Sequence, residues 1–260
     1  FIFILLYLYN YRQISQVYIN RIKLSSKKLN KSLKITQISD FHSNKLVNLD
    51  KLFNKINEFS PDIIVLTGDL IDYKTTDLTL VFDVIRRAKS VTPRVFFVSG
   101  NHETNHRLSN DLYNELAKNE VLILDDMTHT INIDNNIINM MGASFYAEES
   151  DFAKIFKSIN DDEYNLLLSH SPNRPMRYLD NRVDLILSGH THGGQVRIPI
   201  IGAIISPGQG LFPKYDKGTF KLGDTILYID SGLGNSVANL RLFNRVQITN
   251  IEVLPKKTLF

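Results

Sequence analysis

Residues 33–42, LKITQISDFH, form a short apolar stretch typical of a buried strand, which ends in Asp40 and His42. Four further apolar stretches end in the same way, in polar clusters at residues 68–69 (GD), 100–103 (GNHE), 169–171 (SHS) and 189–192 (GHTH). In α/β sheets, ligands bind beyond the carboxyl ends of the strands. The five clusters are therefore expected to converge on one site.

The order of the apolar patterns predicts an α/β fold. Strand and helix patterns alternate up to about residue 119, and strand patterns dominate afterwards, which indicates a mixed sheet system. No linker separates two halves, so residues 35–260 are predicted to form one domain. Strands are expected at 33–39, 63–67, 95–99, 131–133, 137–141, 164–169, 183–188, 225–229 and 247–253, and helices at 46–59, 78–89 and 107–119.

The amino-acid composition excludes several kinds of site and partner. The 260 residues contain no cysteine, which excludes disulfides, thiolate metal sites and a cysteine nucleophile. Any metal must be bound by nitrogen or oxygen ligands such as His, Asp and Asn. Residues 1–34 hold seven basic and no acidic side chains, so the net charge of +3 conceals an acidic body. A nucleic-acid partner is not favoured by that body.

The first residues are unusual. Residues 1–9 (FIFILLYLY) are apolar throughout but too few to span a bilayer, which takes roughly 20 residues. We predict that residues 1–11 are the C-terminal end of a transmembrane segment and that residues 12–34 form a basic juxtamembrane stalk. A signal-peptide core, or a strand or helix packed on the body, are the alternatives. The basic run favours the cytoplasmic face of a membrane.

Each polar cluster has an ordinary structural explanation when taken alone. Asp40 and His42 fit a turn, Asp69 fits a turn after a strand, and Asn101 with His102 fit a helix cap. Even His190 and His192 are only about as often metal ligands as not. Five of the seven histidines nevertheless fall in these clusters, and scattered core histidines would not gather at strand ends.

The ordered set D-x-H, G-D, G-N-H-E, H and G-H-T-H resembles the calcineurin-like metallophosphoesterase superfamily over nearly all of residues 33–254. The resemblance implies a two-sheet mixed β-sandwich flanked by helices. The segments 37–44 (QISDFHSN), 166–172 (LLLSHSP), 188–199 (SGHTHGGQVRIP) and 228–245 resemble its bacterial membrane-associated branch. That branch includes cell-envelope phosphoesterases and enzymes similar to UDP-diacylglucosamine hydrolases of lipid A synthesis.

The resemblance also implies a role for each clustered residue in a two-metal site. Asp40, His42 and His192 would bind one metal, whereas Asn101, His170 and His190 would bind the other. Asp69 would bridge the two metals and take part in catalysis. His102 would remain outside the coordination sphere and act on the leaving oxygen or the transition state. Asn101 and His102 would contact the substrate.

The residue types suit this chemistry on physical grounds. Two divalent ions with two carboxylates leave a surplus of about two positive charges, which favours a bridging hydroxide and an anionic phosphoester. His and Asp ligands fit Mn, Fe, Zn or Co better than Ca or Mg. The predicted function is hydrolysis of a phosphomonoester, phosphodiester or pyrophosphate. The alternatives are a cyclic-nucleotide phosphodiesterase or nuclease with the same metal site, and a non-enzymatic metal-bound scaffold.

One segment bears on the substrate. Residues 198–212 (IPIIGAIISPGQGLF) are apolar and follow the last histidines closely. They fit either a buried strand and turn or an exposed apolar rim beside the metals, and their Gly and Pro content weighs against a long strand. With residues 1–34, such a rim predicts a membrane surface as partner and an amphiphilic or lipid-linked substrate.

Overall fold

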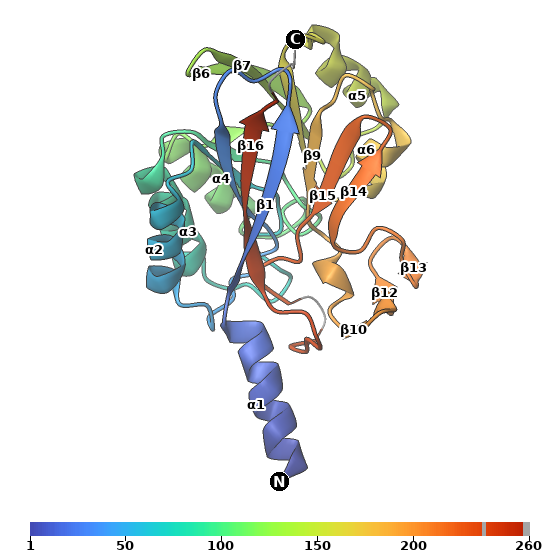
Figure 1. Ribbon diagram of the computed structural model, residues 1–260. Coiled ribbons are helices and arrows are strands. Elements are labelled where there is room, and N and C mark those ends of the chain that lie inside the picture. The colour runs from blue at the N-terminus through green and yellow to red at the C-terminus, as the bar shows by residue number, and fades with distance from the viewer. Residues whose placement is uncertain (236–237, 257–260) are drawn as a thin grey trace.

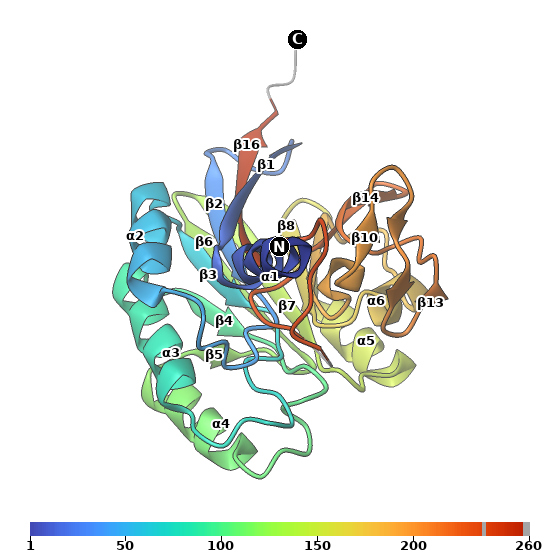
Figure 2. The ribbon, with the colours of Figure 1, turned by 90° about the horizontal axis from the view of Figure 1, so that it is seen from below.

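The computed structural model describes residues 1–235 and 238–256, and in it two six-stranded sheets pack face to face. The first sheet has the order β1-β16-β2-β3-β4-β5 and the second β14-β15-β9-β8-β7-β6. In Figure 2, α2, α3 and α4 cover the outer side of the first sheet, and α5 and α6 lie beside the second. The prediction of a mixed two-sheet sandwich flanked by helices is confirmed.

The strands of the first sheet are β1 (Tyr18–Ser26), β2 (Leu33–Ile38), β3 (Ile63–Leu66), β4 (Val95–Phe97), β5 (Leu122–Ile123) and β16 (Gln247–Pro255). Those of the second are β6 (Met127–Ile133), β7 (Asn136–Ala143), β8 (Tyr164–Ser169), β9 (Leu185–Ser188), β14 (Gly218–Leu222) and β15 (Thr225–Ile229). The helices are α1 (Ile2–Ser15), α2 (Leu49–Phe59), α3 (Thr79–Val91), α4 (Ser109–Lys118), α5 (Glu149–Ile155) and α6 (Asn173–Arg177).

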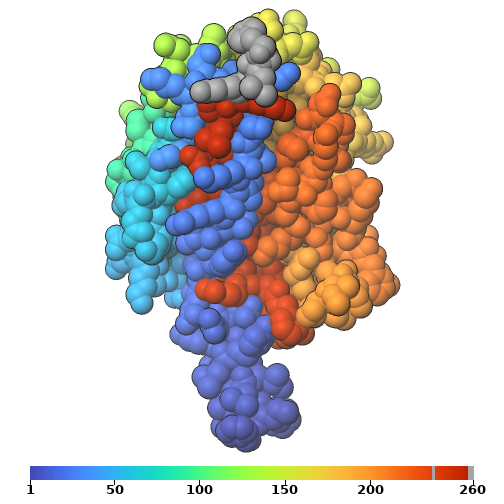
Figure 3. Space-filling view, in the orientation of Figure 1, coloured from blue at the N-terminus to red at the C-terminus, as the bar shows by residue number. Residues whose placement is uncertain are grey.

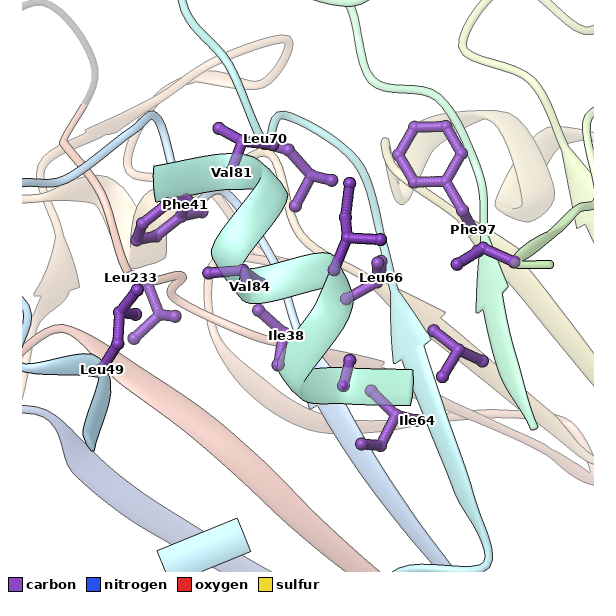
Figure 4. Packing of buried hydrophobic residues seen from close by; sticks show 14 of the residues in the cluster. Ile38, Phe41, Leu49, Ile64, Leu66, Leu70, Val81, Val84, Phe97 and Leu233 are labelled. Carbon is purple, nitrogen blue, oxygen red and sulfur yellow. The ribbon is translucent and has the colours of Figure 1, made fainter. Parts of the chain in front are cut away.

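Strand alternation explains the layers. In β3, Ile63 and Val65 face the second sheet, while Ile64 and Leu66 face the helices. Every residue of this strand is therefore buried, as expected for a parallel sheet covered on both faces. Figure 4 shows Val81 of α3 in the same cluster as these helix-facing strand residues.

α2 illustrates why a predicted helix begins later than its apolar pattern. The side chain of Asn48 accepts a hydrogen bond from the Lys51 amide at 2.9 Å, so the helix begins at Leu49 rather than at residue 46. Its buried face consists of Leu49, Leu52, Phe53 and Ile56, at the spacing of an amphipathic helix.

The N-terminal residues form helix α1, which projects from the body as a short stalk (Figures 1 and 3). Its first eight side chains are largely exposed, whereas Gln13 and Ile14 are buried against the body. Among the helices of the described residues, none has both the length and the apolarity needed to cross a membrane.

Residues 18–26, which the sequence predicted as part of a basic stalk, instead form the edge strand β1, parallel to β16. The basic residues mask an alternating pattern in which Ile22 and Leu24 pack against the core between the sheets. Lys23 of β1 and, after the strand, Lys28 and Lys31 form ion pairs with Glu252, Asp184 and Asp134. β1 carries these charges away from α1 (Figure 1).

Residues 198–212 do not form a buried strand. They lie in two small antiparallel ribbons, β10 (Arg197–Ile198) with β11 (Gly202–Ala203), and β12 (Ile205–Ser206) with β13 (Gly210–Leu211). Their large apolar side chains are exposed: Ile198, Ile200, Ile201, Ile205, Leu211 and Phe212. We call these six side chains the apolar rim.

Candidate metal centre

All five polar clusters meet at one end of the two sheets. Asp40 follows β2, Asp69 follows β3 and Asn101 follows β4, and these three strands are parallel. His170 and His190 follow the parallel strands β8 and β9 of the second sheet. The carboxyl ends of strands from both sheets therefore supply one site, as the sequence indicated.

Among the described residues, three groups of three side chains have a metal-binding arrangement, and two of these groups lack His102. One set is Asp40, His42 and His192, and the other is Asp69, His170 and His190; within each set the candidate ligand atoms all lie within 4.8 Å of one another. Asp69 also lies close to the first set, since its Oδ2 is 3.7 Å from Nε2 of His42. The first set contains the residues that the family resemblance gave to one metal, and the second contains His170 and His190 together with Asp69, the predicted bridge. The role of Asn101 as a ligand stays a prediction.

Buried polar atoms without partners indicate what the site is built to hold. Both ring nitrogens of His42, Nδ1 of His192 and Oδ1 of Asn101 are buried without a hydrogen-bond partner. Leaving such groups unsatisfied is costly, so each one requires an explanation. A divalent cation would accept lone pairs from ring nitrogens and amide oxygen, and the residues therefore fit a metal centre.

His170 is oriented by the backbone. Its Nδ1 lies 2.7 Å from the carbonyl oxygen of Thr67, which leaves Nε2 facing Asp69 Oδ2 at 3.1 Å. Nδ1 of His190 lies 3.2 Å from the same Nε2. A hydrogen bond between one ring nitrogen and a backbone carbonyl oxygen fixes the tautomer and the direction of a metal-binding histidine.

The backbone is strained at most of the candidate ligands. Five of them have positive φ angles between 47° and 68°, a left-handed conformation that costs non-glycine residues roughly 1–3 kcal/mol each. Strain concentrated on one site is typical of functional positions. The five are Asp40, His42, Asp69, His190 and His192.

Burial leaves three imidazoles neutral. It lowers the pKa of His42 to about 4 and that of His190 to about 3, and it holds the pKa of His192 well below its usual range. Burial also raises the pKa of Asp40 to about 7. Neutral imidazole is the form that binds metals, so these histidines need to lose no proton at neutral pH.

His170 behaves differently. Burial by itself would lower its pKa, but the Asp69 carboxylate outweighs burial and raises the pKa to about 10. In turn, His170 overcomes the effect of burial on Asp69 and holds the pKa of that carboxyl well below its usual range. Without metal the two groups therefore form an ion pair, with the proton on His170.

Sequence reasoning gave no role to Glu103, although it lies within the GNHE cluster. Its buried carboxylate accepts hydrogen bonds from the backbone amides of Asp69, Leu70 and Gly100, at 2.9, 2.7 and 2.8 Å. It thus ties together the turns that carry Asp69 and Asn101. A side chain on Gly100 would collide with Asp69, which is why a glycine stands there.

His102 lies at the mouth of the site. Its backbone amide donates to Asp69 Oδ1 at 3.0 Å, and its Nε2 is 3.9 Å from Asp69 Oδ2. Its side chain is 22% exposed, whereas those of His42 and His170 are almost fully buried. It also forms a third group with His42 and Asp69 in which a metal would fit.

Aromatic residues flank the mouth on two sides. Phe145 packs on His170 and His190, with ring centroids 6.0 and 5.4 Å apart. On the other side, the ring of Tyr73 stacks on His102 at 6.2 Å.

One pocket is lined by both Ile205 of the apolar rim and the candidate ligand His192. This pocket, of about 360 Å³, runs from His192 to Ile205 and Pro207. The neighbouring β10–β11 ribbon is held by Arg197, which donates to the Gly193 carbonyl oxygen and pairs with Asp216, at 2.9 and 2.8 Å. The rim is thus connected to the turn that carries His192.

Comparison with known proteins agrees with this geometry. The family model of calcineurin-like phosphoesterases matches residues 33–194, more than half of the chain. An uncharacterized metallophosphoesterase of Campylobacter jejuni is 33% identical, over 88% of this chain and 61% of its own length. The phosphodiesterase YaeI of Escherichia coli is 30% identical, over 85% of this chain and 82% of its own length. The chain thus spans less than two thirds of the Campylobacter relative.

A solved structure shares the fold. The NAD nucleotidase of Haemophilus influenzae superposes with a TM-score of 0.51 at 16% identity, over 78% of this chain and 45% of that protein. At this identity the likeness supports the two-sheet architecture alone.

Proposed function

The chain belongs to the calcineurin-like phosphoesterase family, and we propose on that basis that it hydrolyses phosphoesters with two divalent metal ions bound side by side. The family makes it a metal-dependent hydrolase of ester bonds. The observation that carries the two-ion proposal is the position of Asp69, which belongs to one ligand set and lies 3.7 Å from His42 of the other.

When bound, the two ions would activate a water as nucleophile and neutralise charge on the phosphoryl oxygens. The protein's own residues provide the geometry for this reaction. Glu103 fixes the turn of Asp69, and Thr67 fixes the ring of His170. His102 is the group at the mouth that can donate a proton to the leaving oxygen.

A test of the two-ion site replaces the shared carboxylate. Asp69→Asn should lose both ions, because each ion would lose part of its charge compensation. Asp72→Asn is the matched control: Asp72 is a buried carboxylate nearby that accepts a hydrogen bond from the Thr75 hydroxyl and belongs to neither ligand set. Elemental analysis should find two metals per chain in the control. Two metals retained in Asp69→Asn would refute the shared role.

We propose further that the substrate is amphiphilic and is reached at a membrane surface. The support is the apolar rim, whose Ile200 is fully exposed and whose Ile205 lines the pocket next to His192. Exposed apolar patches beside a polar site are typical of surfaces that contact lipid or another partner. The lipid-linked envelope substrates of the membrane-associated branch would fit such a surface.

The full chain can be assayed with three phosphodiesters: a phosphatidyl nitrophenyl ester in phosphatidylcholine vesicles, bis(p-nitrophenyl) phosphate in solution, and cyclic AMP. The proposal predicts the highest kcat/KM for the vesicle ester. A preference for the soluble diester over the vesicle ester would contradict an amphiphilic substrate while leaving the metal chemistry intact.

A nucleotide substrate is the second candidate. The ring of Tyr73 is 61% exposed, stacks on His102 and has the Lys74 ammonium 5.0 Å from its centroid, so a base would stack on it in place of Lys74. Preference for cyclic AMP, together with a raised KM for it in Tyr73→Ala, would favour this candidate.

A further inference from the structure

Arg241 is a fully buried cation next to the metal centre that the proposed reaction does not use. Burial lowers its pKa to about 10, against the opposing effect of the Asp40 and Asp230 carboxylates, so it stays charged at neutral pH. None of the ion pairs among the described residues involves it. Its role must therefore be sought in its hydrogen bonds.

The guanidinium of Arg241 holds one loop together. This loop connects β15 to β16 and is described over residues 230–235 and 238–246. Arg241 donates to the carbonyl oxygens of Ser231 and Gly234, both at 2.6 Å, and to Oδ1 of Asn235 at 3.0 Å. The second half of the loop is thus bound to the first.

The first half of the loop rests on the turn that carries Asp40 and His42. The amides of Leu233 and Gly234 donate to the carbonyl oxygens of Ser39 and Asp40, at 3.0 and 2.5 Å. The approach is so close that a Cβ at Gly234 would lie 2.7 Å from Cβ of His42. This contact restrains two ligands whose backbones are left-handed.

The second half of the loop contacts the third ligand of the same set. Nδ2 of Asn244 donates to the carbonyl oxygen of His192 at 2.7 Å. Asp40, His42 and His192 are therefore all in contact with the β15–β16 loop. His170, by contrast, is oriented by Thr67 of the first sheet.

Helix α1 docks on the outside of this loop. The side chain of Asn10 makes two hydrogen bonds of 2.9 Å, donating to the Asn239 carbonyl oxygen and accepting from the Arg241 amide. The hydroxyl of Tyr9 accepts from the Phe243 amide at 3.1 Å. In Figure 2, α1 lies end-on against the red loop segments.

We propose that Asn10 and Arg241 are positioning residues for one half of the metal centre: α1 and the guanidinium together hold the β15–β16 loop against Asp40, His42 and His192. The inference rests on the proposed two-ion site. It explains why a buried arginine donates its hydrogen bonds to carbonyl oxygens although it lies beside a centre that binds cations. It also predicts that changes in α1 alter the affinity for one metal more than that for the other.

The decisive variant is Asn10→Ala, which removes two hydrogen bonds outside the metal centre. Loss of two hydrogen bonds should lower the affinity for one of the two metals about tenfold. Ser15→Ala is the matched control, since Ser15 donates only to Tyr11 within α1. Calorimetric titration of Mn²⁺ into the metal-free full chain measures the two affinities. Anomalous scattering from crystals grown at limiting Mn²⁺ then identifies the metal position whose occupancy has fallen.

The expected result is selective loss at the Asp40, His42 and His192 position in Asn10→Ala, with no change in Ser15→Ala. Arg241→Met should cause a larger loss, and Arg241→Lys an intermediate one. A second readout is hydrogen exchange, in which the amides of Leu233 and Gly234 should exchange faster in Asn10→Ala. If the Arg241 variants do not fold, Asn10→Ala and Tyr9→Phe still decide the question.

The inference would be overturned if Asn10→Ala lowered the Mn²⁺ affinity of both positions equally. It would also be overturned if both the Mn²⁺ affinities and the amide hydrogen exchange were unchanged in this variant. Failure of the proposed function looks different: the unaltered protein would then bind fewer than two Mn²⁺ ions.

Discussion

At the scale of single residues, His102 is the clustered histidine whose role is least constrained by burial. It contacts Asp69 through its backbone amide and leaves its ring at the mouth of the site. The geometry also allows it to complete a group with His42 and Asp69. Metal content and leaving-group dependence separate the two roles.

His102→Gln should retain both metals and lower turnover by about 10²–10⁴-fold, as expected for loss of a general acid. The loss should be smallest for nitrophenyl esters, because nitrophenolate leaves with little need of a proton. Steady-state kinetics with alkyl and nitrophenyl esters, alongside elemental analysis, test this. A missing metal in the variant would make His102 a ligand, and equal losses for both esters would exclude the acid role.

The Asp69–His170 pair makes metal binding dependent on pH. The pKa of His170 is raised above its value in the unfolded chain, so the pair stabilises the metal-free protein fully below about pH 6.5 and loses that effect as pH rises through about 10. A metal must displace this proton. Metal affinity should therefore rise with pH across that range, by up to tenfold per unit for one proton.

Calorimetry of Zn²⁺ or Mn²⁺ binding in buffers of different ionisation enthalpy measures the protons released. At pH 7.5 about one proton from His170 should appear. The number of protons released should fall as the pH rises through about 10, because His170 is then already neutral before the metal binds. Binding that is independent of pH between 6.5 and 9 would show that the proton is not held there.

The candidate ligands could be predicted from the sequence because each lies within four residues after the end of a strand and has a metal-binding side chain. Glu103 and Arg241 could not be assigned, because their partners are mostly backbone groups of turns and of an irregular loop. Such partners leave no spacing that a sequence can show. The left-handed backbone at His42 was equally hidden, since no glycine marks it.

At the scale of elements, long periodic segments were predicted well and short or edge elements poorly. α2 and α3 have clear buried faces and lie within three residues of their predicted bounds. α5 and α6, of seven and five residues, are too short to show a helical period. β1 was missed because its basic residues resembled a solvated stalk.

The ribbons that carry the apolar rim form an element with a separable role. Ile200→Glu should weaken binding to phosphatidylcholine vesicles and lower kcat/KM for a vesicle ester, because a charge would have to enter the lipid. The loss on soluble bis(p-nitrophenyl) phosphate should be much smaller. Ile137→Glu is the matched control, a partly exposed isoleucine at the start of β7. Equal losses on both substrates would contradict a lipid-facing rim.

At the scale of the whole molecule, α1, the ligand sets and the apolar rim all lie at one end. The β15–β16 loop joins α1 to the turn of Asp40, and the ribbons are tied to the turn of His192. The basic residues predicted to flank a membrane lie instead mostly along and after β1, several of them in ion pairs. Any membrane attachment at this end would therefore rest mainly on apolar side chains rather than on basic ones.

The final prediction concerns attachment through α1. Deleting residues 1–8 removes exposed apolar side chains and retains Tyr9 and Asn10, which hold the β15–β16 loop. Thermal unfolding should therefore be unchanged, whereas sedimentation with vesicles should fall. For the full chain, sedimentation should persist in 1 M salt, where the Debye length is roughly 3 Å and electrostatic attraction is screened. Binding that salt abolishes would restore the basic residues as the anchor. Equal sedimentation of the full chain and the shortened chain would assign the attachment to the apolar rim. If neither protein sediments with vesicles, a membrane substrate is excluded.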